Sequence, residues 1–188
     1  MGLNPGGRCD GGEEPSVENG NAYRIECWKE DGLQTPLQKQ ICLFYESIAV
    51  QAGTKFDALM DKTLAANLCP FRSGNWAELP KKEEAIKFSK NLWGTLFDKL
   101  NPSVIACVGR LTHFHVYSLL KERAFVFAQS RKLKTGWGKI QCELTHVTHG
   151  QKNVMLVGLP HLSRFRIFGR DGAKNEIQYL AKVIAERI

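Results

Sequence analysis

Apolar residues recur every three or four positions in four parts of the chain, which is the spacing of one face of a helix. In the first of these parts, Ile41, Phe44 and Ile48 follow one another in this way. Polar residues occupy most positions between them, so each helix would bury one face against a core. The pattern predicts helices at about Leu37–Val50, Lys82–Leu100, Thr112–Glu122 and Ala173–Ile188.

Shorter apolar runs predict the strands of a sheet. Ser103–Val108 and Asn153–Leu159 are bounded runs rich in β-branched residues, as expected for buried strands. Ala124–Gln129 and Lys139–Val147 are predicted to be extended, and the second alternates apolar and polar residues. Because helix and strand patterns alternate through most of the chain, we predict a three-layer α/β/α fold with a largely parallel central sheet.

The first 36 residues show no periodicity and are rich in Gly, Asn, Glu and Pro, so they are predicted to form a long loop. The 188 residues suit a single domain, 1–188. A hydrophobic share of 43% is that of an ordinary globular protein, and no apolar run approaches the roughly 18 residues that span a bilayer. We therefore expect a monomeric protein that does not enter a membrane.

The charge balance narrows the choice of partner. The chain has 26 basic and 19 acidic residues, a formal net charge of +7. This excess suits a polyanionic partner such as nucleic acid, although a basic surface without such a partner explains it equally well. No secretory signal is recognisable at the start, so a reducing compartment, the cytoplasm or the nucleus, is expected.

Cysteine and histidine spacing gives little support for a metal. The six cysteines lie 15 to 38 residues apart and form no CxxC pair, which argues against a zinc ribbon or an iron–sulfur cluster. The pairs His113/His115 and His146/His149 are the alternative source of ligands. Residues two apart on a helix point in different directions, so the first pair cannot easily share one ion. We predict no metal and no cofactor.

Two segments combine residue types that suit a binding site. Gly2–Gly7 places an Asn-Pro pair between glycines, which let the backbone approach a ligand closely. Asn67–Ser73 begins with a polar Asn after an apolar run and is interrupted by a proline. Each also has a purely structural interpretation, because the first segment taken alone is a turn and Asn67 taken alone is a cap.

A third segment, Leu159–Phe168, directly follows a predicted strand. It offers the imidazole of His161, the hydroxyl of Ser163, two phenylalanines that are predicted to be exposed, and three arginines when Arg170 is included. Interleaved basic and aromatic residues suit phosphate contact together with base stacking or insertion. The structural alternative is an amphipathic loop whose phenylalanines belong to the core.

Together the three segments resemble the uracil-DNA glycosylase superfamily, especially its mismatch-specific and single-strand-selective branches. Those enzymes carry a Gly-x-Asn-Pro-Gly first motif, an Asn near the middle of the chain and a late His-Pro-Ser loop. The matching residues stand here in the same order, at Gly2–Gly6, Asn67 and His161–Ser163. The resemblance implies a DNA glycosylase of base excision repair, which hydrolyses the N-glycosidic bond of uracil or a related damaged pyrimidine.

The resemblance also implies roles for single residues. Asn4 would position the attacking water, and Asn67 would read the Watson–Crick edge of the flipped base. His161 would stabilise the departing base, on which negative charge develops. The other residues that would surround the base are Pro5, Gly6, Tyr23 and Ser163, with Tyr23 as the stacking platform.

The third segment, Leu159–Phe168 extended to Arg170, is called the late loop, and it would contact the DNA after the base has left the duplex. A side chain of this loop would fill the gap, and Phe165 or Arg164 is the candidate wedge. The residues implied in DNA binding are Arg164, Phe165, Arg166 and Arg170.

The sequence departs from the family pattern in three places. It begins at the first motif, where the family has a buried strand immediately before it, so either a preceding segment or a strand of the sheet is absent. Leu162 stands at the usual position of a proline, which is expected to loosen the loop. Asn4 offers no carboxylate base for the water.

Two other classes of function remain open from the sequence. A nucleic-acid-binding protein would keep the fold and the basic groove without turnover, since a fold does not guarantee activity. A different nucleotide or nucleoside enzyme on a similar sheet is the third possibility. Cleavage of an oligonucleotide that contains uracil discriminates among the three.

Overall fold

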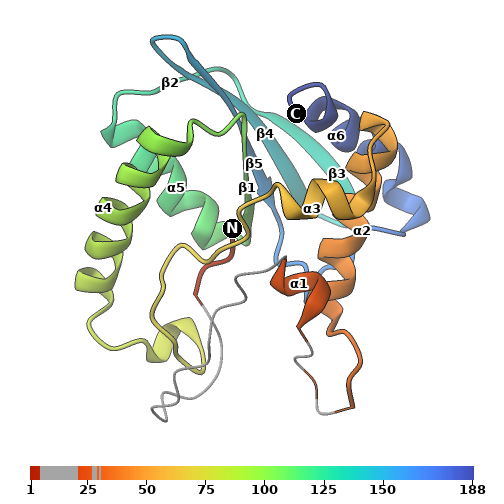
Figure 1. Cartoon of the computed structure of the whole chain (residues 1–188), viewed down its shortest axis with the longest axis horizontal. Coiled ribbons are helices and arrows are strands. Elements are labelled where there is room, and N and C mark those ends of the chain that lie inside the picture. The colour runs from red at the N-terminus through yellow and green to blue at the C-terminus, as the bar shows by residue number, and fades with distance from the viewer. Residues whose placement is uncertain (5–20, 27–28, 30) are drawn as a thin grey trace.

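The computed structural model of the protein describes residues 1–4, 21–26, 29 and 31–188 (Figure 1). Its α-helices are α1 (Ala22–Ile25), α2 (Pro36–Ala52), α3 (Phe56–Asp61), α4 (Lys82–Leu100), α5 (Arg110–Glu122) and α6 (Lys174–Ala185). Two short 3-10 helices are η1 (Trp76–Glu78) and η2 (Asp171–Ala173). The strands are β1 (Val104–Val108), β2 (Val126–Phe127), β3 (Arg131–Trp137), β4 (Ile140–His149) and β5 (Lys152–Leu159). The fold is mixed α/β, as predicted.

The five strands form one sheet in the order β1-β5-β4-β2, and β3 also pairs with β4. β1 and β5 are parallel. β4 is antiparallel to each of its neighbours, β2, β3 and β5. The sheet of named strands is therefore mostly antiparallel, and the largely parallel sheet expected from the sequence is not confirmed.

Two tight hairpins explain this direction. β3 and β4 are joined by Gly138 and Lys139, and β4 and β5 by Gly150 and Gln151. Gly138 has a φ of 55° and Gly150 a φ of 57°, in the left-handed region that two-residue hairpin turns require. Because β3 and β5 are both antiparallel to β4, they run in the same direction and end at the same edge of the sheet.

Helices cover both faces of the sheet, with α4 and α5 on one side and α2, α3 and α6 on the other (Figure 1). Along β5, Met155 and Val157 belong to the apolar cluster that includes α2 and α6. Val154 and Leu156 belong to the cluster that includes α4 and α5. Alternate residues of a strand point to opposite faces, so this central strand has apolar side chains on both.

Local sequence explains where the long helices begin and end. Thr35 and Gln38 form a reciprocal capping box at the start of α2, where Pro36 occupies the first turn. α2 ends at Gly53, which has a φ of 62°. α4 has the predicted bounds, and its buried positions Ala85, Ser89, Trp93 and Phe97 repeat every four residues along one face.

The structure also contains elements that the sequence pattern did not predict. α1 lies within the first 36 residues, so the prediction of a loop is wrong for Ala22–Ile25. The side chain of Asn21 accepts a hydrogen bond from the Tyr23 amide and caps this short helix. α3 and β3 were also missed, and β3 has only two buried residues, Leu133 and Thr135.

Candidate functional site

The first residues of the chain lie beside β1. The amine of Met1 donates to the carbonyl of Ala106 over 2.6 Å, and the Val108 amide donates to the Met1 carbonyl over 2.8 Å. One residue that bonds to two positions of its neighbour in this way is paired in the parallel sense. Met1 therefore lies next to β1, on the side away from β5, and runs parallel to both strands.

Gly2 pairs in the same parallel sense with residues 66–68, on the side of the Met1–Gly2 segment that faces away from β1. It forms a parallel bridge with Asn67. In this bridge the Gly2 amide donates to the Ala66 carbonyl over 3.0 Å, and the Leu68 amide donates to the Gly2 carbonyl over 2.8 Å. Residues 66–68, Met1–Gly2, β1 and β5 therefore lie side by side and run in one direction. The chain leaves all four at the same edge, which brings the described residues of the three sequence motifs to that edge.

The side chains of Asn67 and Tyr23 both approach Gly2. A Cβ atom on Gly2 would lie 2.3 Å from Oδ1 of Asn67 and 3.8 Å from the hydroxyl of Tyr23. Only glycine leaves room for the Asn67 carboxamide at this position. Burial raises the pKa of the Tyr23 hydroxyl, which therefore stays protonated at neutral pH. The pair offers an amide and a phenol, both half-buried, at the end of the sheet.

Asn4 is held by the segment that follows Asn67. Its Nδ2 donates to Oγ of Ser73 over 2.8 Å. Ser73 is buried, and its hydroxyl donates to the carbonyl of Asn75 over 2.8 Å. This chain of hydrogen bonds fixes the plane of the Asn4 carboxamide and ties the first motif to the second.

His161 follows β5 and is exposed. Its Nδ1 lies 2.8 Å from Oγ of Ser163. The ring lies over Gly109, where an added Cβ would be 3.6 Å from Cδ2 of His161. The Gly109 amide donates to the Leu159 carbonyl over 2.9 Å, so the chain segments that follow β1 and β5 are joined where His161 begins.

Leu162 anchors the loop from below. Its side chain is fully buried in the cluster on the α2 and α6 face. The His161 carbonyl accepts from the amides of Arg164 and Phe165 over 3.0 and 2.9 Å. Apolar burial and a hydrogen-bonded turn therefore anchor this loop on the α2 and α6 face.

The two phenylalanines of the late loop have different environments. Phe168 is buried and packs on Phe44 with ring centroids 5.3 Å apart, so the expectation that it is exposed is wrong. Its amide and carbonyl both bond to the side chain of Gln40, each over 2.9 Å. Phe165 is half-buried and lies edge-on to Trp137, with ring centroids 6.0 Å apart.

Positive charge is concentrated in the same part of the chain. Residues 123–170 contain nine Lys and Arg and one acidic residue, Glu143. Because the whole chain has a formal net charge of +7, the rest of the chain is close to neutral. Arg164, Arg166 and Arg170 are exposed. Within the described ranges, none of these three forms an ion pair with a carboxylate. Their charges are available to a polyanion.

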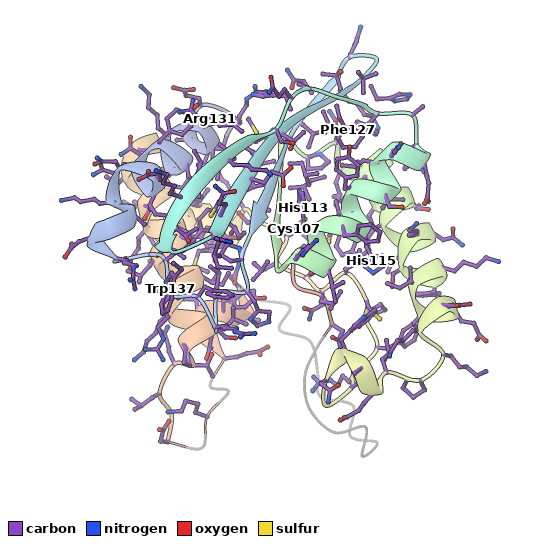
Figure 2. The ribbon with its side chains drawn as sticks, turned by 180° about the vertical axis from the view of Figure 1, so that it is seen from behind. Cys107, His113, His115, Phe127, Arg131 and Trp137 are labelled. Atoms are coloured by element: carbon purple, nitrogen blue, oxygen red, sulfur yellow. The ribbon has the colours of Figure 1, made fainter. Side chains whose placement is uncertain are left out.

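Trp137 and Gly109 belong to this edge of the sheet and were not predicted from the sequence. Figure 2 shows Trp137 and Arg131 at opposite ends of β3, with Trp137 at the end where the strand stops. The signal was present as a bulky aromatic residue between two glycines, Gly136 and Gly138, before a tight turn. Gly109, with a φ of 98°, directly follows a predicted strand and precedes a predicted helix.

Other expectations concern metal ligands, two residues of the first motif and membrane spans. In the part of the chain that the structure describes, no group of three or more His, Cys, Asp and Glu side chains is arranged to hold a metal ion. His113 and His115 lie on α5, and His146 and His149 on β4. Pro5 and Gly6 lie outside the described residues. None of the described helices is long and apolar enough to cross a membrane.

Comparison with family models, with curated proteins and with solved structures finds no significant match to this chain. The functional interpretation therefore depends on the residues of the site themselves.

Proposed function

We propose that this protein is a DNA glycosylase of the uracil-DNA glycosylase type, which hydrolyses the bond between uracil, or a related damaged pyrimidine, and deoxyribose. The observation that carries the proposal is the meeting of three distant segments at one edge. Gly2 pairs with Asn67, Met1 pairs with β1, and Gly109 after β1 lies under the ring of His161. Asn4, Asn67 and His161 therefore come from neighbouring strand ends.

The finer fold assignment is part of the same proposal. Residues 66–68, Met1–Gly2, β1 and β5 form a consecutive parallel set with helices on both faces. This supports a three-layer α/β/α domain whose binding site lies at the carboxyl ends of its parallel strands. In this interpretation the β2, β3 and β4 strands are an antiparallel extension beside β5.

Base recognition is assigned to Asn67 and Tyr23. An amide presents one donor and one acceptor, which match adjacent positions on the edge of uracil. The Tyr23 hydroxyl approaches the same position on Gly2 as the Asn67 carboxamide, which supports assigning both side chains to one base. The flipped base would enter between strand ends, away from water, where each hydrogen bond discriminates more strongly.

Catalysis is assigned to His161 with Asn4. Cleavage of the glycosidic bond leaves negative charge on the uracil ring and positive charge on the sugar. A Ser163 hydroxyl that donates to Nδ1 of His161 leaves the proton of the neutral ring on Nε2. Nε2 would then donate to the uracil carbonyl oxygen that becomes negative as the bond to N1 breaks, and Asn4 would orient the water that attacks the sugar.

Single-turnover cleavage of an oligonucleotide that contains one uracil tests the proposal. We expect cleavage by the unaltered protein, and a loss on the order of a hundredfold in His161→Ala with little change in DNA affinity. His149→Ala is the matched control, because His149 is exposed at the β4–β5 turn. Binding without any cleavage would instead assign the chain to the non-catalytic nucleic-acid-binding class.

A further inference from the structure

The turn between β3 and β4 lies against the late loop. The indole Nε1 of Trp137 donates to the carbonyl of Arg166 over 3.2 Å, and the guanidinium of Arg170 lies 4.5 Å from the centre of the Trp137 ring. Phe165 packs against the same ring. A residue of the hairpin and three residues of the loop therefore form one cluster.

The backbone of the hairpin is shaped for this contact. The β3–β4 pairing shifts register between Lys134 and Trp137, and Gly136 between them has a φ of 73°. A Cβ on Gly136 would lie 3.0 Å from Nε of Arg170 and 3.3 Å from the carbonyl carbon of Gly172. The bulge and the glycine allow Arg170 to pass over the strand and stack on Trp137.

The cluster is open to solvent and positively charged. Trp137 is 38% exposed although three residues contact it. Arg164, Arg166, Arg170 and the adjacent Lys139 are exposed, and none forms an ion pair with an acidic side chain in the described parts of the chain. An exposed aromatic ring among unpaired cations is the combination that binds nucleic acid strands, by base stacking and phosphate contact.

We propose that the β3–β4 hairpin is a second DNA-binding element, in which Trp137 stacks on an unpaired base that flanks the site while Arg170 and Lys139 contact its phosphates. This inference rests on the proposed DNA-binding function and extends the DNA surface beyond the late loop. β3 and β5 end at the same edge of the sheet, so Trp137 lies on the side of the molecule where His161 lies.

The test measures affinity for uracil-free oligonucleotides by fluorescence anisotropy. Trp137→Ala is expected to weaken binding of a single strand on the order of tenfold and to weaken duplex binding less. Trp76→Ala is the matched control, because Trp76 lies in η1 and packs near His115. Equal affinities of the two variants for the single strand overturn the inference.

A conservative pair of variants keeps the test valid if Trp137→Ala does not fold. Stacking of a base on the indole quenches its emission, so Trp137→Phe should remove part of the quenching by a bound strand while retaining most of the affinity. Trp76→Phe should show the same quenching by a bound strand as the unaltered protein. The inference is contradicted if both variants lose part of the quenching or if neither does.

The two proposals fail differently. Trp137-dependent binding without uracil cleavage leaves the hairpin inference standing and removes the glycosylase assignment. Uracil cleavage together with DNA binding that does not depend on Trp137 leaves the glycosylase assignment standing and removes the hairpin inference. A protein that binds no DNA removes both.

Discussion

At the scale of single residues, Gly2 is the position at the site that least tolerates a side chain, because the Asn67 carboxamide lies against it. A Cβ atom at position 2 would lie only 2.3 Å from Oδ1 of Asn67, so any side chain at this position displaces the carboxamide. The sequence indicated Asn4, Asn67 and His161 through their motifs, because these motifs have a characteristic order. It could not indicate that the Gly2 position serves Asn67, because that contact joins residues 65 positions apart.

We predict that Asn67 sets base preference. Asn67→Ala should lower the single-turnover rate on uracil by roughly tenfold or more, because an unpaired buried edge of the base loses its hydrogen bonds. Asn67→Asp changes the donor to an acceptor and should favour cytosine relative to uracil. Gly2→Ala should also lower the uracil rate, because the added methyl group displaces the carboxamide of Asn67 while residue 67 remains asparagine.

Asn91→Ala is the control for this prediction, because Asn91 is exposed on α4. Rates on uracil and cytosine that are the same in Asn67→Ala as in Asn91→Ala would remove the assignment of Asn67.

His113 gives a second prediction at the residue scale, one of pH-dependent stability. Its ring packs on Gly158, where a Cβ would lie 3.0 Å from Cδ2, and its Nε2 is buried with no partner among the described residues (Figure 2). Burial lowers the pKa of His113, while the charge of Glu143 opposes this shift. The unfolded chain then takes up the proton first as pH falls through about 6.5, so the folded state loses stability there.

Urea unfolding at about pH 7.5 and about pH 5 measures this effect on both sides of the ordinary histidine pKa. The loss of unfolding free energy on acidification should be smaller in His113→Gln than in the unaltered protein. His149→Gln, on the exposed β4–β5 turn, should leave the loss unchanged. A loss of the same size in all three proteins would exclude His113 as its source.

At the scale of elements, the four long helices α2, α4, α5 and α6 were predicted well because each has a long apolar face, whereas the short α1 and α3 were not predicted. α4 has the predicted bounds, and α2 differs from its predicted range by one or two residues at each end. β3 was missed because its Lys-Leu-Lys-Thr-Gly-Trp sequence includes a glycine and has only two inward residues. Phe168 was misplaced because a basic, aromatic loop does not reveal which ring enters the core.

The contact between α2 and the late loop gives a prediction at this scale. Gln40 is buried and bonds to both the amide and the carbonyl of Phe168. Gln40→Leu leaves these two backbone groups without partners, which should cost about 2–5 kcal/mol of unfolding free energy. Chemical denaturation measures the difference from Gln51→Leu, an exposed position near the end of the same helix. Equal midpoints for the two variants would show that the Gln40 contact does not stabilise the fold.

At the scale of the whole molecule, strand direction was the main feature that the sequence pattern could not supply. An alternating run such as Lys139–Val147 has the same period in parallel and antiparallel sheets. Direction was set instead by the two glycine-containing turns around β4. The β3–β4 turn also brings Lys139 to the edge of the sheet where β5 ends and His161 begins, on the same side as the exposed Arg164, Arg166 and Arg170.

The last prediction concerns this charge distribution. If the late-loop arginines contact phosphates, the logarithm of DNA affinity should fall steeply with the logarithm of salt concentration, by a slope of about 0.9 per contact on duplex DNA. Replacing Arg164, Arg166 and Arg170 together by Gln should therefore lower the slope by about 2 to 3. A control variant makes the same change in net charge at exposed lysines of α4 and α5, namely Lys87, Lys99 and Lys121. Anisotropy titrations at several salt concentrations give both slopes. The arginine variant should have the shallower slope because only direct contacts release counterions, whereas equal slopes would mean that net charge alone attracts the DNA.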